Sequence, residues 1–438
     1  MRYDAVVIGS GAAGLYFALS ASKKGKKIAL VEKAQLGGTA FATGCLPVKK
    51  IMDKIKSYEK AKALENENLL KLNPDKEVLF KAGIKSLENI ESFISDKLSR
   101  NNIDVYIGEG EVVSETIVRV NEAQLETEHI ILATGTTAST VEGFAPIDHE
   151  VILSHESLIT MKQLPEEMTI LGGNVEGIEF ASMLSELGVK VKVIEKEAQI
   201  LQGNDEDLIE NIKARLINNG VELILNTEVT AIEKIEEEAV IRFSNRESLK
   251  VKSLLVTGIR KPNIPKGIKE LKLEMKSGFI KIDENLMTSK SSIYAVGDIN
   301  GIHGMAHIAL QQGILLADYI WEGKQISTQY SSLPRCIFTI NELAGAGCQE
   351  HELENCVVKK LYFKDTFRGL DSSYDDGFMK IIIQDEIVKG IWINSIDAGA
   401  LVGSVGLWID NKVSVEAIKR SLFIHPTLSE ALIDAIID

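Results

Sequence analysis

Basic residues and cysteine are scarce in this chain of 438 residues, and each shortage excludes a class of protein. Lysine and arginine number 49 against 63 acidic residues, which gives a formal net charge of −14. This balance argues against a nucleic-acid partner or an anionic membrane surface, because both require clustered basic side chains. The four cysteines have neither metal-ligand spacing nor the density of a disulfide framework, so we predict no metal site.

Long apolar runs are also missing. The most apolar stretch, residues 398–409, is rich in glycine and too short to span a bilayer core of about 30 Å. The first residues enter a strand with no basic or apolar leader, so we expect no signal peptide and a cytoplasmic location. With 45% hydrophobic and 26% charged residues, the chain is long enough for roughly two or three domains with their own cores.

A dinucleotide-binding βαβ unit begins the chain. The apolar run 5–8 predicts a parallel strand buried on both faces, followed by a glycine turn and an apolar-periodic helix. The second strand, 28–31, ends in Glu32, about 20 residues beyond the glycines, where an acid binds ribose hydroxyls. The residues expected at this dinucleotide are Gly9, Gly11, Ala12, Ala13, Gly14, Glu32 and Lys33.

A second βαβ unit starts near residue 168. A strand at 169–171 precedes a Gly-rich turn and a helix, and the next strand ends in Glu195, which favours NADH over the phosphorylated cofactor. The middle fingerprint glycine is replaced by Asn174, and Glu176 brings negative charge close to a dianionic ligand. Both departures lower the affinity that we expect for NADH. The residues expected at this nucleotide are Gly172, Asn174, Gly177 and Glu195.

The stretch 37–50, GGTAFATGCLPVKK, follows the first unit after a few residues. It resembles the GGTCxNxGCxPSK helix of the flavin-dependent pyridine nucleotide-disulfide oxidoreductases, the family of dihydrolipoamide dehydrogenase, mercuric reductase and glutathione reductase. In that family two cysteines, five positions apart, form a disulfide beside the flavin. Here Cys45 matches the second cysteine, and the first is Ala40. The resemblance implies that the first dinucleotide is FAD.

Further family motifs follow in order. Residues 133–135 resemble the ATG turn, 254–263 resemble the ATGRRPN junction, and 293–298 resemble the second FAD motif. Residues 305–307 continue that motif on a helix that would point at the flavin, and for His307 a packing role is preferred to a catalytic one. The resemblance also places these residues at the cofactors: Gly38, Thr39, Gly44, Lys49, Ala133, Thr134, Gly135, Gly258, Gly297, Asp298, Met305, Ala306 and His307.

The predicted fold is α/β, with two Rossmann-like dinucleotide-binding domains and a C-terminal α+β interface domain. We expect FAD-binding segments at 1–145 and 265–325, an NAD(P)-binding domain inserted at 146–264, and the dimerisation domain at 326–438. Alternating apolar residues at 379–383 and 388–393 predict an antiparallel sheet in the last domain.

The resemblance also implies catalytic roles for Cys45, Lys49, Glu179, His425 and Glu430. Lys49 and Glu179 match a pair beside the flavin. The segment from Phe423 to Glu430 resembles the family's HPTxSE segment, in which a histidine oriented by a glutamate acts as acid/base in the partner subunit of a homodimer. Alanine at position 40 excludes ordinary dithiol–disulfide exchange. As a thiolate at a helix start, Cys45 is expected to have a lowered pKa.

Four functions stay open at this point. The first is an FAD-dependent oxidoreductase that uses Cys45 as a single redox thiol, cycling through a sulfenic acid, persulfide or mixed disulfide. The second is an NAD(P)H:quinone or dye reductase that uses the flavin alone. The third is an FAD-binding scaffold or regulatory protein without catalysis, and the fourth is a flavoprotein reduced by a protein donor. The acceptor, and any partner that supplies a second thiol, are not named by the sequence.

Overall fold

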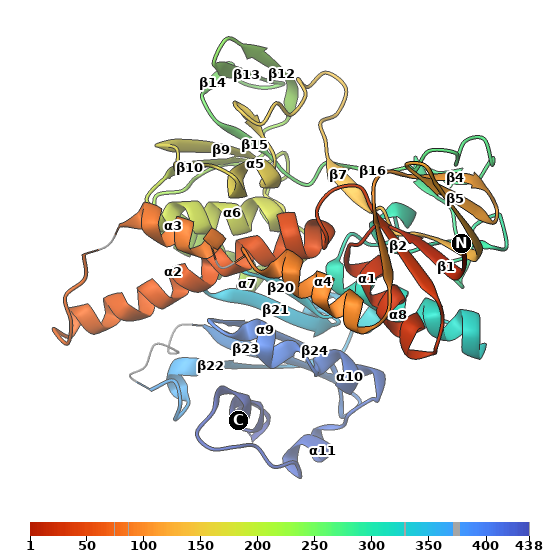
Figure 1. Cartoon of the computed structure of the whole chain (residues 1–438). Helices are drawn as coiled ribbons and strands as arrows, with labels where there is room; N and C mark the ends of the chain where they lie inside the picture. Colours follow the sequence, from red (N-terminus) through yellow and green to blue (C-terminus); the bar gives the residue numbers. More distant parts are fainter. Residues whose placement is uncertain (74, 86, 328–329, 371–376, 438) are drawn as a thin grey trace.

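The structure, a computed structural model, describes residues 1–73, 75–85, 87–327, 330–370 and 377–437. Figure 1 shows three lobes, each built on its own sheet: the first at the right, the second at the top and the C-terminal one, in blue, at the bottom. The first two sheets are mainly parallel and the third is antiparallel, which confirms the predicted fold class.

The first lobe contains a seven-stranded sheet in the order β3-β2-β1-β6-β5-β4, with β19 also paired to β6. Its strands are β1 (Arg2–Ile8), β2 (Ile28–Glu32), β3 (Asp104–Ile107), β4 (Gly110–Ser114), β5 (Ile117–Val120), β6 (Ala123–Leu132) and β19 (Ile293–Ala295). Val7 in β1 lies between Leu30 and Ile131 in register, and all three are buried, as expected for a parallel strand covered on both faces. Because β19 follows the whole second sheet in sequence, two chain segments assemble this lobe.

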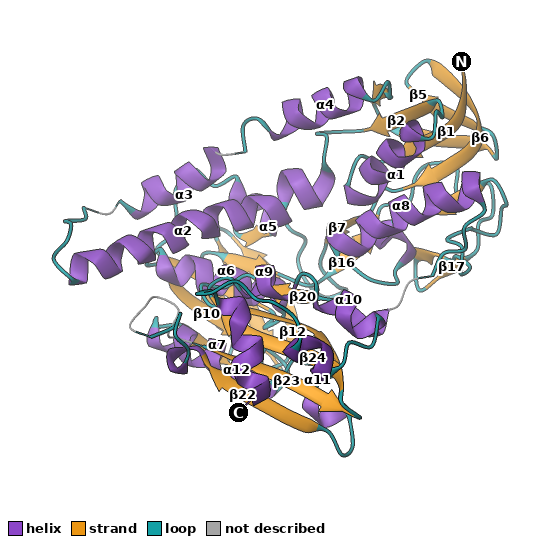
Figure 2. Cartoon of the chain, turned by 90° about the horizontal axis from the view of Figure 1, so that it is seen from below, coloured by secondary structure: helices purple, strands orange, loops and turns teal. Residues whose placement is uncertain are grey.

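Two helices cover one face of the first sheet. They are α1 (Ala12–Lys23) and α8 (Ala306–Glu322), and they pack side by side (Figure 2). Gly313 of α8 lies against the backbone of Ala13 and Phe17 in α1, so closely that a Cβ would sit 2.3 Å from the Ala13 carbonyl oxygen. This close approach packs the middle of α8 against the N-terminal half of α1.

The second lobe contains a five-stranded parallel sheet in the order β11-β10-β9-β15-β8. Its strands are β8 (Ile152–Leu153), β9 (Glu167–Leu171), β10 (Lys190–Ile194), β11 (Glu222–Ile224) and β15 (Leu254–Val256). Its helices are α5 (His155–Ile159), α6 (Val175–Glu186) and α7 (Glu206–Asn218). An antiparallel sheet of β12 (Val229–Ile235), β13 (Glu238–Phe243) and β14 (Leu249–Val251) packs against its other face.

Two short strands connect the first two lobes. β7 (Thr136–Ala138) leaves the first lobe and β16 (Arg260–Pro262) returns to it, and the two pair antiparallel. A small hairpin of β17 (Met275–Lys276) and β18 (Phe279–Ile280) follows before β19. The ATG-like turn, residues 133–135, comes directly before β7, and Gly258 lies two residues before β16. The predicted cofactor residues Gly135 and Gly258 therefore both lie beside this connection.

A long helix, α2 (Cys45–Asn66), runs between the second lobe and the C-terminal lobe (Figure 1). Its buried residues Ile51, Met52 and Ile55 belong to one core with helices of the second lobe and with the C-terminal sheet. Helices α3 (Lys76–Lys85) and α4 (Ile90–Arg100) follow. No helix among the described residues is long and apolar enough to cross a membrane.

The C-terminal sheet has the order β20-β21-β24-β23-β22 and is antiparallel throughout. Its strands are β20 (Arg335–Ile337), β21 (Glu342–Gly347), β22 (Val357–Tyr362), β23 (Phe378–Gln384) and β24 (Ile387–Ser395). Alternate residues face opposite sides. Ile382 and Trp392 join the core with α2, whereas Ile381 and Ile391 pack under the outer helices. Those helices are α9 (Ala398–Val402), α10 (Val405–Asp410), α11 (Val415–Lys419) and α12 (Ala431–Ile437).

Candidate functional site

The segment expected to be one redox helix is divided in two. Residues Thr39–Thr43 form a single π-helical turn, and α2 starts anew at Cys45. Gly44 separates them with φ −143° and ψ −93°, outside the helical region, and its Cα lies so close to Thr39 that a Cβ would be 2.7 Å from the Thr39 methyl carbon. The turn places Ala40 before the break, and Cys45 is the first residue of α2.

Lys49 joins all three lobes. It lies one turn after Cys45 on the same side of α2, and its Nζ is 2.6 Å from Oε2 of Glu179 in α6. The other oxygen of Glu179 accepts a hydrogen bond of 3.0 Å from the backbone amide of Phe338, just after β20. The Lys49 ammonium also lies 4.7 Å from the centre of the Phe338 ring. The predicted Lys49–Glu179 pair is therefore present, and Cys45 lies beside it.

The expected lowering of the Cys45 pKa is wrong. The protein around the thiol raises its pKa, chiefly because desolvation disfavours the thiolate. Lys49 lowers it in part, whereas the carboxylates of Glu179 and Asp298 raise it further. The helix start alone could not reveal this, because both carboxylates come from distant segments. All four cysteines are free, so Cys45 is not part of a disulfide.

The first βαβ unit leaves space at its helix N-terminus. No atom lies within 4 Å of the place where a Cβ on Gly11 would be, and no side chain caps α1. Gly9 has φ +108°, and a Cβ there would lie 2.4 Å from the Ala133 carbonyl oxygen. Gly38, in the segment that leads to Cys45, packs against Gly11. A Cβ on Gly38 would lie 3.1 Å from the Gly11 Cα. A pyrophosphate fits such an uncapped, glycine-lined helix start.

Glu32 stands at the end of β2 and turns back into the unit. Its carboxylate accepts hydrogen bonds from the Ser10 amide (3.0 Å), the Ser10 hydroxyl (2.7 Å) and the Ala34 amide (2.9 Å). Lys33 is exposed next to it. Glu195 repeats the arrangement at the end of β10, where it accepts from the amides of Gly173 (2.6 Å) and Glu197 (3.0 Å).

The second FAD-like motif lies close to the first. Gly297 packs against Ala13 of α1, where a Cβ would be 3.2 Å from the Ala13 Cβ. Next to it, the Asp298 carboxylate accepts a hydrogen bond of 3.2 Å from Thr136, and burial raises its pKa. Met305 is the N-cap residue of α8, which like α1 has no side-chain cap, and Ala306 and His307 form its first turn. Two uncapped helix starts and a half-buried acid therefore lie in this lobe, an arrangement suited to FAD.

The second βαβ unit is different, because side chains fill its turn. Asn174 caps α6: its Oδ1 accepts from the Gly177 amide at 3.1 Å, and its Nδ2 donates to the Thr257 hydroxyl at 3.0 Å. The Glu176 carboxylate accepts from the Gly258 amide at 3.0 Å. Burial by itself raises the pKa of Glu176, but His155, the Gly258 amide and Arg260 outweigh it and hold the pKa below its usual value.

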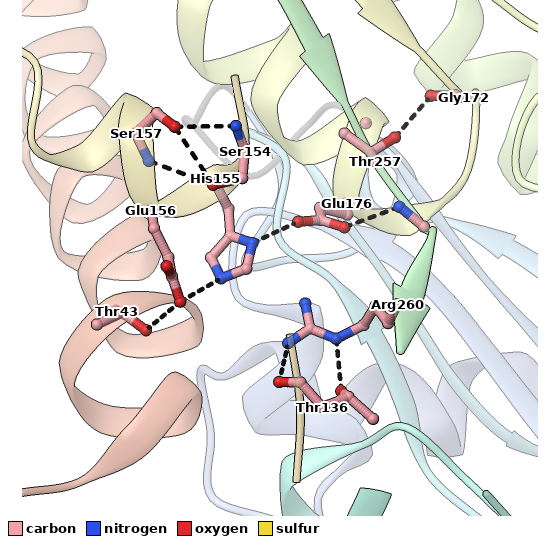
Figure 3. Close-up of polar contacts among 12 residues, drawn as sticks. Thr43, Thr136, Ser154, His155, Glu156, Ser157, Gly172, Glu176, Thr257 and Arg260 are labelled. Carbon is pink, nitrogen blue, oxygen red and sulfur yellow. Dashed lines mark hydrogen bonds and ion pairs between the residues drawn. The ribbon is translucent and has the colours of Figure 1, made fainter. Parts of the chain in front are cut away.

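His155 was missed by the sequence analysis. It begins α5, and its side chain, 4% exposed, lies between two carboxylates (Figure 3). Its Nδ1 is 3.2 Å from Glu176, and its Nε2 is 3.8 Å from Glu156, which also accepts a weak hydrogen bond of 3.4 Å from Thr43. Neither ring nitrogen has a hydrogen-bond partner of good geometry among the described residues. A lone histidine after a two-residue strand carries no sequence signal of this burial.

Arg260 was also missed. Its guanidinium donates to the hydroxyl (2.7 Å) and the carbonyl oxygen (3.0 Å) of Thr136 across the paired strands β7 and β16 (Figure 3). Its charge favours the ionised forms of Cys45, Asp298 and Glu176. The only available signal was its place in the junction motif, since its proximity to Cys45 depends on how the two lobes meet.

His425 lies far along the chain, in the outer layer of the C-terminal lobe. Its Nδ1 is 2.9 Å from the Glu430 carboxylate, so the predicted pair is present, and 67% of its side chain is exposed. It follows α11 and precedes α12, on the face of the C-terminal sheet that α2 does not cover. The sheet therefore separates His425 from Cys45 of the same chain.

Comparisons with known proteins agree with this arrangement. The model of the family described as pyridine nucleotide-disulphide oxidoreductase matches residues 3–313, and the model of that family's dimerisation domain matches residues 333–436. Dihydrolipoyl dehydrogenase of Chlamydia pneumoniae is 30% identical over 98% of this chain and 95% of its own length. Dihydrolipoyl dehydrogenase of Geobacillus stearothermophilus is 28% identical over 99% of this chain and 95% of its own length.

Solved structures give the same result. The HOCl-induced flavoprotein disulfide reductase RclA from Escherichia coli, in its Cu(II) complex, superposes with a TM-score of 0.89 at 25% identity, over 100% of this chain and 99% of that one. LpdA from Mycobacterium tuberculosis superposes with a TM-score of 0.91 at 21% identity, over 100% and 99% of the two chains. At that identity the second likeness supports the fold alone.

Proposed function

Because the chain belongs to the pyridine nucleotide-disulphide oxidoreductase family and is thus an oxidoreductase, we propose that it passes electrons from NADH through FAD to a small sulfur or peroxide acceptor, with Cys45 as its only redox thiol. The chain is dihydrolipoamide dehydrogenase-like along its whole length. Family membership also argues against the non-catalytic scaffold. The observation that carries the proposal is Cys45 at the start of α2, one turn from the Lys49–Glu179 pair.

We assign FAD to the first lobe, built from 1–145 and 265–325, and the nicotinamide nucleotide to 146–264. The uncapped starts of α1 and α8, the open space at Gly11 and the half-buried Asp298 support the first assignment. When bound there, FAD supplies two-electron transfer between the donor and the thiol site. The ion pair with Glu179 would hold Lys49 beside the cofactor, and the Phe338 amide holds Glu179 in place through a hydrogen bond.

Cys45 carries out the acceptor step in this proposal. With a hydroperoxide, its thiolate takes the terminal oxygen, so that the O–O bond breaks and Cys45 becomes a sulfenic acid. The alkoxide that leaves takes a proton from a general acid. Two electrons from the donor and one proton then convert the sulfenic acid to the thiolate and water. Ala40 cannot form a disulfide with Cys45, so the sulfenic acid persists until electrons from the donor reduce it to the thiolate.

The general acid is His425 of the partner subunit in a homodimer. Within one chain the C-terminal sheet separates this histidine from α2, which argues against an action on its own Cys45. Apolar side chains are exposed around it: Leu422 is 99% exposed and Ile424 78%. A partner subunit would cover this surface, and Glu430 would keep the imidazole oriented.

One observation favours the flavin-only reductase as a second candidate. The raised pKa of Cys45 leaves most of the thiol protonated near neutral pH, and a protonated thiol is a poor nucleophile. An enzyme that reduces quinones or dyes from the flavin does not use the thiol at all. The two candidates therefore differ in whether turnover depends on Cys45.

Replacing the thiol by a hydroxyl separates them. We expect Cys45→Ser to abolish turnover with hydroperoxide or persulfide acceptors while reduction of a dye continues near the wild-type rate, because the dye takes electrons without the thiol. The measurement is steady-state NADH oxidation with each acceptor. Cys356→Ser, which removes a cysteine far along the chain, is the matched control. Equal rates of Cys45→Ser and wild type on every acceptor would establish the flavin-only candidate.

A further inference from the structure

The nucleotide crevice of the second lobe lies between β9 and β15. Along the chain the sheet grows from β9 to β10 and β11, and then returns to place β15 on the other side of β9. Ligands of open α/β sheets bind outside the carboxyl ends of the strands at such a reversal. Here those ends are the turn from Gly172 to Gly177 and the pair Thr257–Gly258.

Asn174 bridges the two sides of this crevice. Its amide nitrogen donates to Thr257, and the same atom lies 2.5 Å from the position that a Cβ would take on either Gly172 or Gly258. Its amide oxygen accepts the hydrogen bond of the Gly177 amide, one of the first-turn donors of α6. Donors of this kind are the groups that bind a pyrophosphate at a helix start.

Glu176 makes a second bridge beside the first. One carboxylate oxygen accepts from the Gly258 amide, and the other faces Nδ1 of His155 (Figure 3). Only 27% of the Glu176 side chain is exposed. Both ring nitrogens of His155 face carboxylates, Nδ1 that of Glu176 and Nε2 that of Glu156. The Glu176 carboxylate held across the crevice is thus negatively charged, and the His155 ring lies behind it.

The first βαβ unit shows the same turn without bridges. Gly11 stands where the second unit has Asn174, and Ala13 stands where it has Glu176. The space at Gly11 is open, and α1 has no side-chain cap. The two units share one backbone design, so the filled crevice comes from side chains of the second unit and not from its fold.

His155 is well placed to hold the second bridge. It is fixed from behind by Glu156, whose carboxylate also contacts Thr43 of the turn before Cys45. The ring lies against that turn, with its Cδ2 3.6 Å from the Cβ position of Gly44. Arg260 is the other cation that favours the ionised form of Glu176. His155 therefore reaches from the Cys45 segment to the nucleotide crevice.

We propose that His155 is a positioning residue that keeps Glu176 across the crevice, so that Glu176 and Asn174 together set a low affinity for the nicotinamide donor. These three residues form what we call the donor latch. A bound dinucleotide has to displace Glu176 from the Gly258 amide and Asn174 from the Gly177 amide. The proposal rests on NADH as the donor, and it identifies which residues determine how much NADH the enzyme needs.

The test is equilibrium binding of NAD⁺, which needs no turnover, to the FAD-loaded protein by isothermal titration. We expect Glu176→Ala to tighten binding roughly tenfold, about 1.4 kcal/mol, because it frees an amide and removes a like charge. Asn174→Gly should also tighten it. Glu206→Ala is the matched control: Glu206 is an exposed first-turn glutamate of α7 in the same lobe, and its loss should change nothing.

A double-mutant cycle tests His155 itself. His155→Ala should tighten binding less than Glu176→Ala, because the negative charge of Glu176 stays in the lobe. Combined with Glu176→Ala, it should have no further effect. His155→Asn keeps an N–H near the position of Nδ1 and should restore the wild-type affinity. Equal effects of His155→Ala with and without Glu176 would overturn its positioning role.

The outcomes also separate the latch from the proposed donor. If Glu176→Ala binds NAD⁺ no more tightly than wild type while NADH reduces the flavin of both, the latch is wrong and NADH remains the donor. If only the variants bind NAD⁺ and are reduced by NADH, the latch is supported and the wild type uses another donor. If dithionite bleaches the flavin of every form but no form binds NAD⁺, both proposals are wrong.

Discussion

Ala40 and Cys45 together limit the chemistry of this oxidoreductase. The methyl group of Ala40 can neither attack a substrate disulfide nor close one with Cys45, so the segment cannot carry out ordinary dithiol–disulfide exchange. The thiol has Lys49 on one side, but Glu179 and Asp298 are close enough to counter it. At the scale of single residues, the protonation of Cys45 therefore decides how fast it reacts.

The pH dependence of Cys45 alkylation follows from these contacts. Because desolvation raises the pKa of the thiol, the rate of reaction with iodoacetamide should rise with pH and reach its midpoint above about 8.5, the usual thiol value. Lys49→Met should move the midpoint higher, since the lysine stabilises the thiolate. Mass spectrometry of the Cys45 peptide measures the rate, and Lys50→Met, at an exposed neighbour, serves as control. A midpoint below 8.5 would contradict the raised pKa.

Helix α2 is the element on which the three lobes meet. Lys49 and Lys56 are seven residues apart and so lie on one side of the helix, two turns from each other. Lys49 binds Glu179 of the second lobe, and Lys56 binds Glu342 of the C-terminal sheet. The start of α2, and with it Cys45, is therefore positioned by ion pairs as well as by the apolar core beneath it.

A buried lysine attaches α7 to the same sheet. Lys380 of β23 is 4% exposed, and its Nζ lies 2.8 Å from Asp205, the N-cap residue of α7, and 2.9 Å from Glu350. Lys380→Met should lower the free energy of unfolding by about 3 kcal/mol, because it leaves Asp205 buried without a counter-charge. Denaturation in urea, followed by flavin fluorescence, measures the loss.

The matched control for this variant is Lys360→Met. Lys360 lies on the neighbouring strand β22, is 30% exposed and pairs with Asp207 at 3.1 Å. A partly exposed pair contributes little, so we expect a loss below about 1 kcal/mol. Similar losses in the two variants would mean that burial of the Lys380 pair does not strengthen the attachment of α7.

At the scale of the whole molecule, His425, the proposed general acid, is exposed on the far side of the C-terminal sheet from Cys45 of the same chain. His425 and the exposed Leu422 and Ile424 form one outer surface of the C-terminal lobe, beyond the sheet that covers α2. Phe367, 80% exposed, lies next to the His425 ring, with the ring centres 6.2 Å apart. Exposed apolar side chains grouped in this way are typical of an interface between subunits.

Mixed dimers test whether His425 acts across that interface. Cys45→Ser and His425→Gln dimers should each be nearly inactive with a peroxide acceptor. After the two are mixed and allowed to exchange subunits, each mixed dimer contains one site with both native side chains if His425 acts on the partner subunit, so activity should return. If His425 acts on its own chain, no mixed dimer has such a site and activity stays absent. We expect Leu422→Glu to yield monomers by light scattering. These monomers should also lose peroxide turnover, because a monomer has no partner subunit to supply His425.

The sequence by itself determined the two βαβ units, the order of the motifs and the family resemblance. These features are local: a buried strand, a glycine turn and a terminal acid lie within about 30 residues, so pattern alone predicts them, as Gly9, Glu32 and Glu195 show. The pairs Lys49–Glu179 and His425–Glu430 were also anticipated, because each residue belongs to a family motif.

Only the tertiary structure decided how those motifs act on one another. The pKa of Cys45 depends on Glu179 and Asp298, which come from distant segments, and the helix start alone predicted the wrong direction. The side chains of Asn174 and Glu176 close the crevice because β15 brings Thr257 and Gly258 opposite them, and His155 is buried only where α5 meets the turn before Cys45. Charge, burial and access are sums over neighbours in space, and most of those neighbours lie far apart in the sequence.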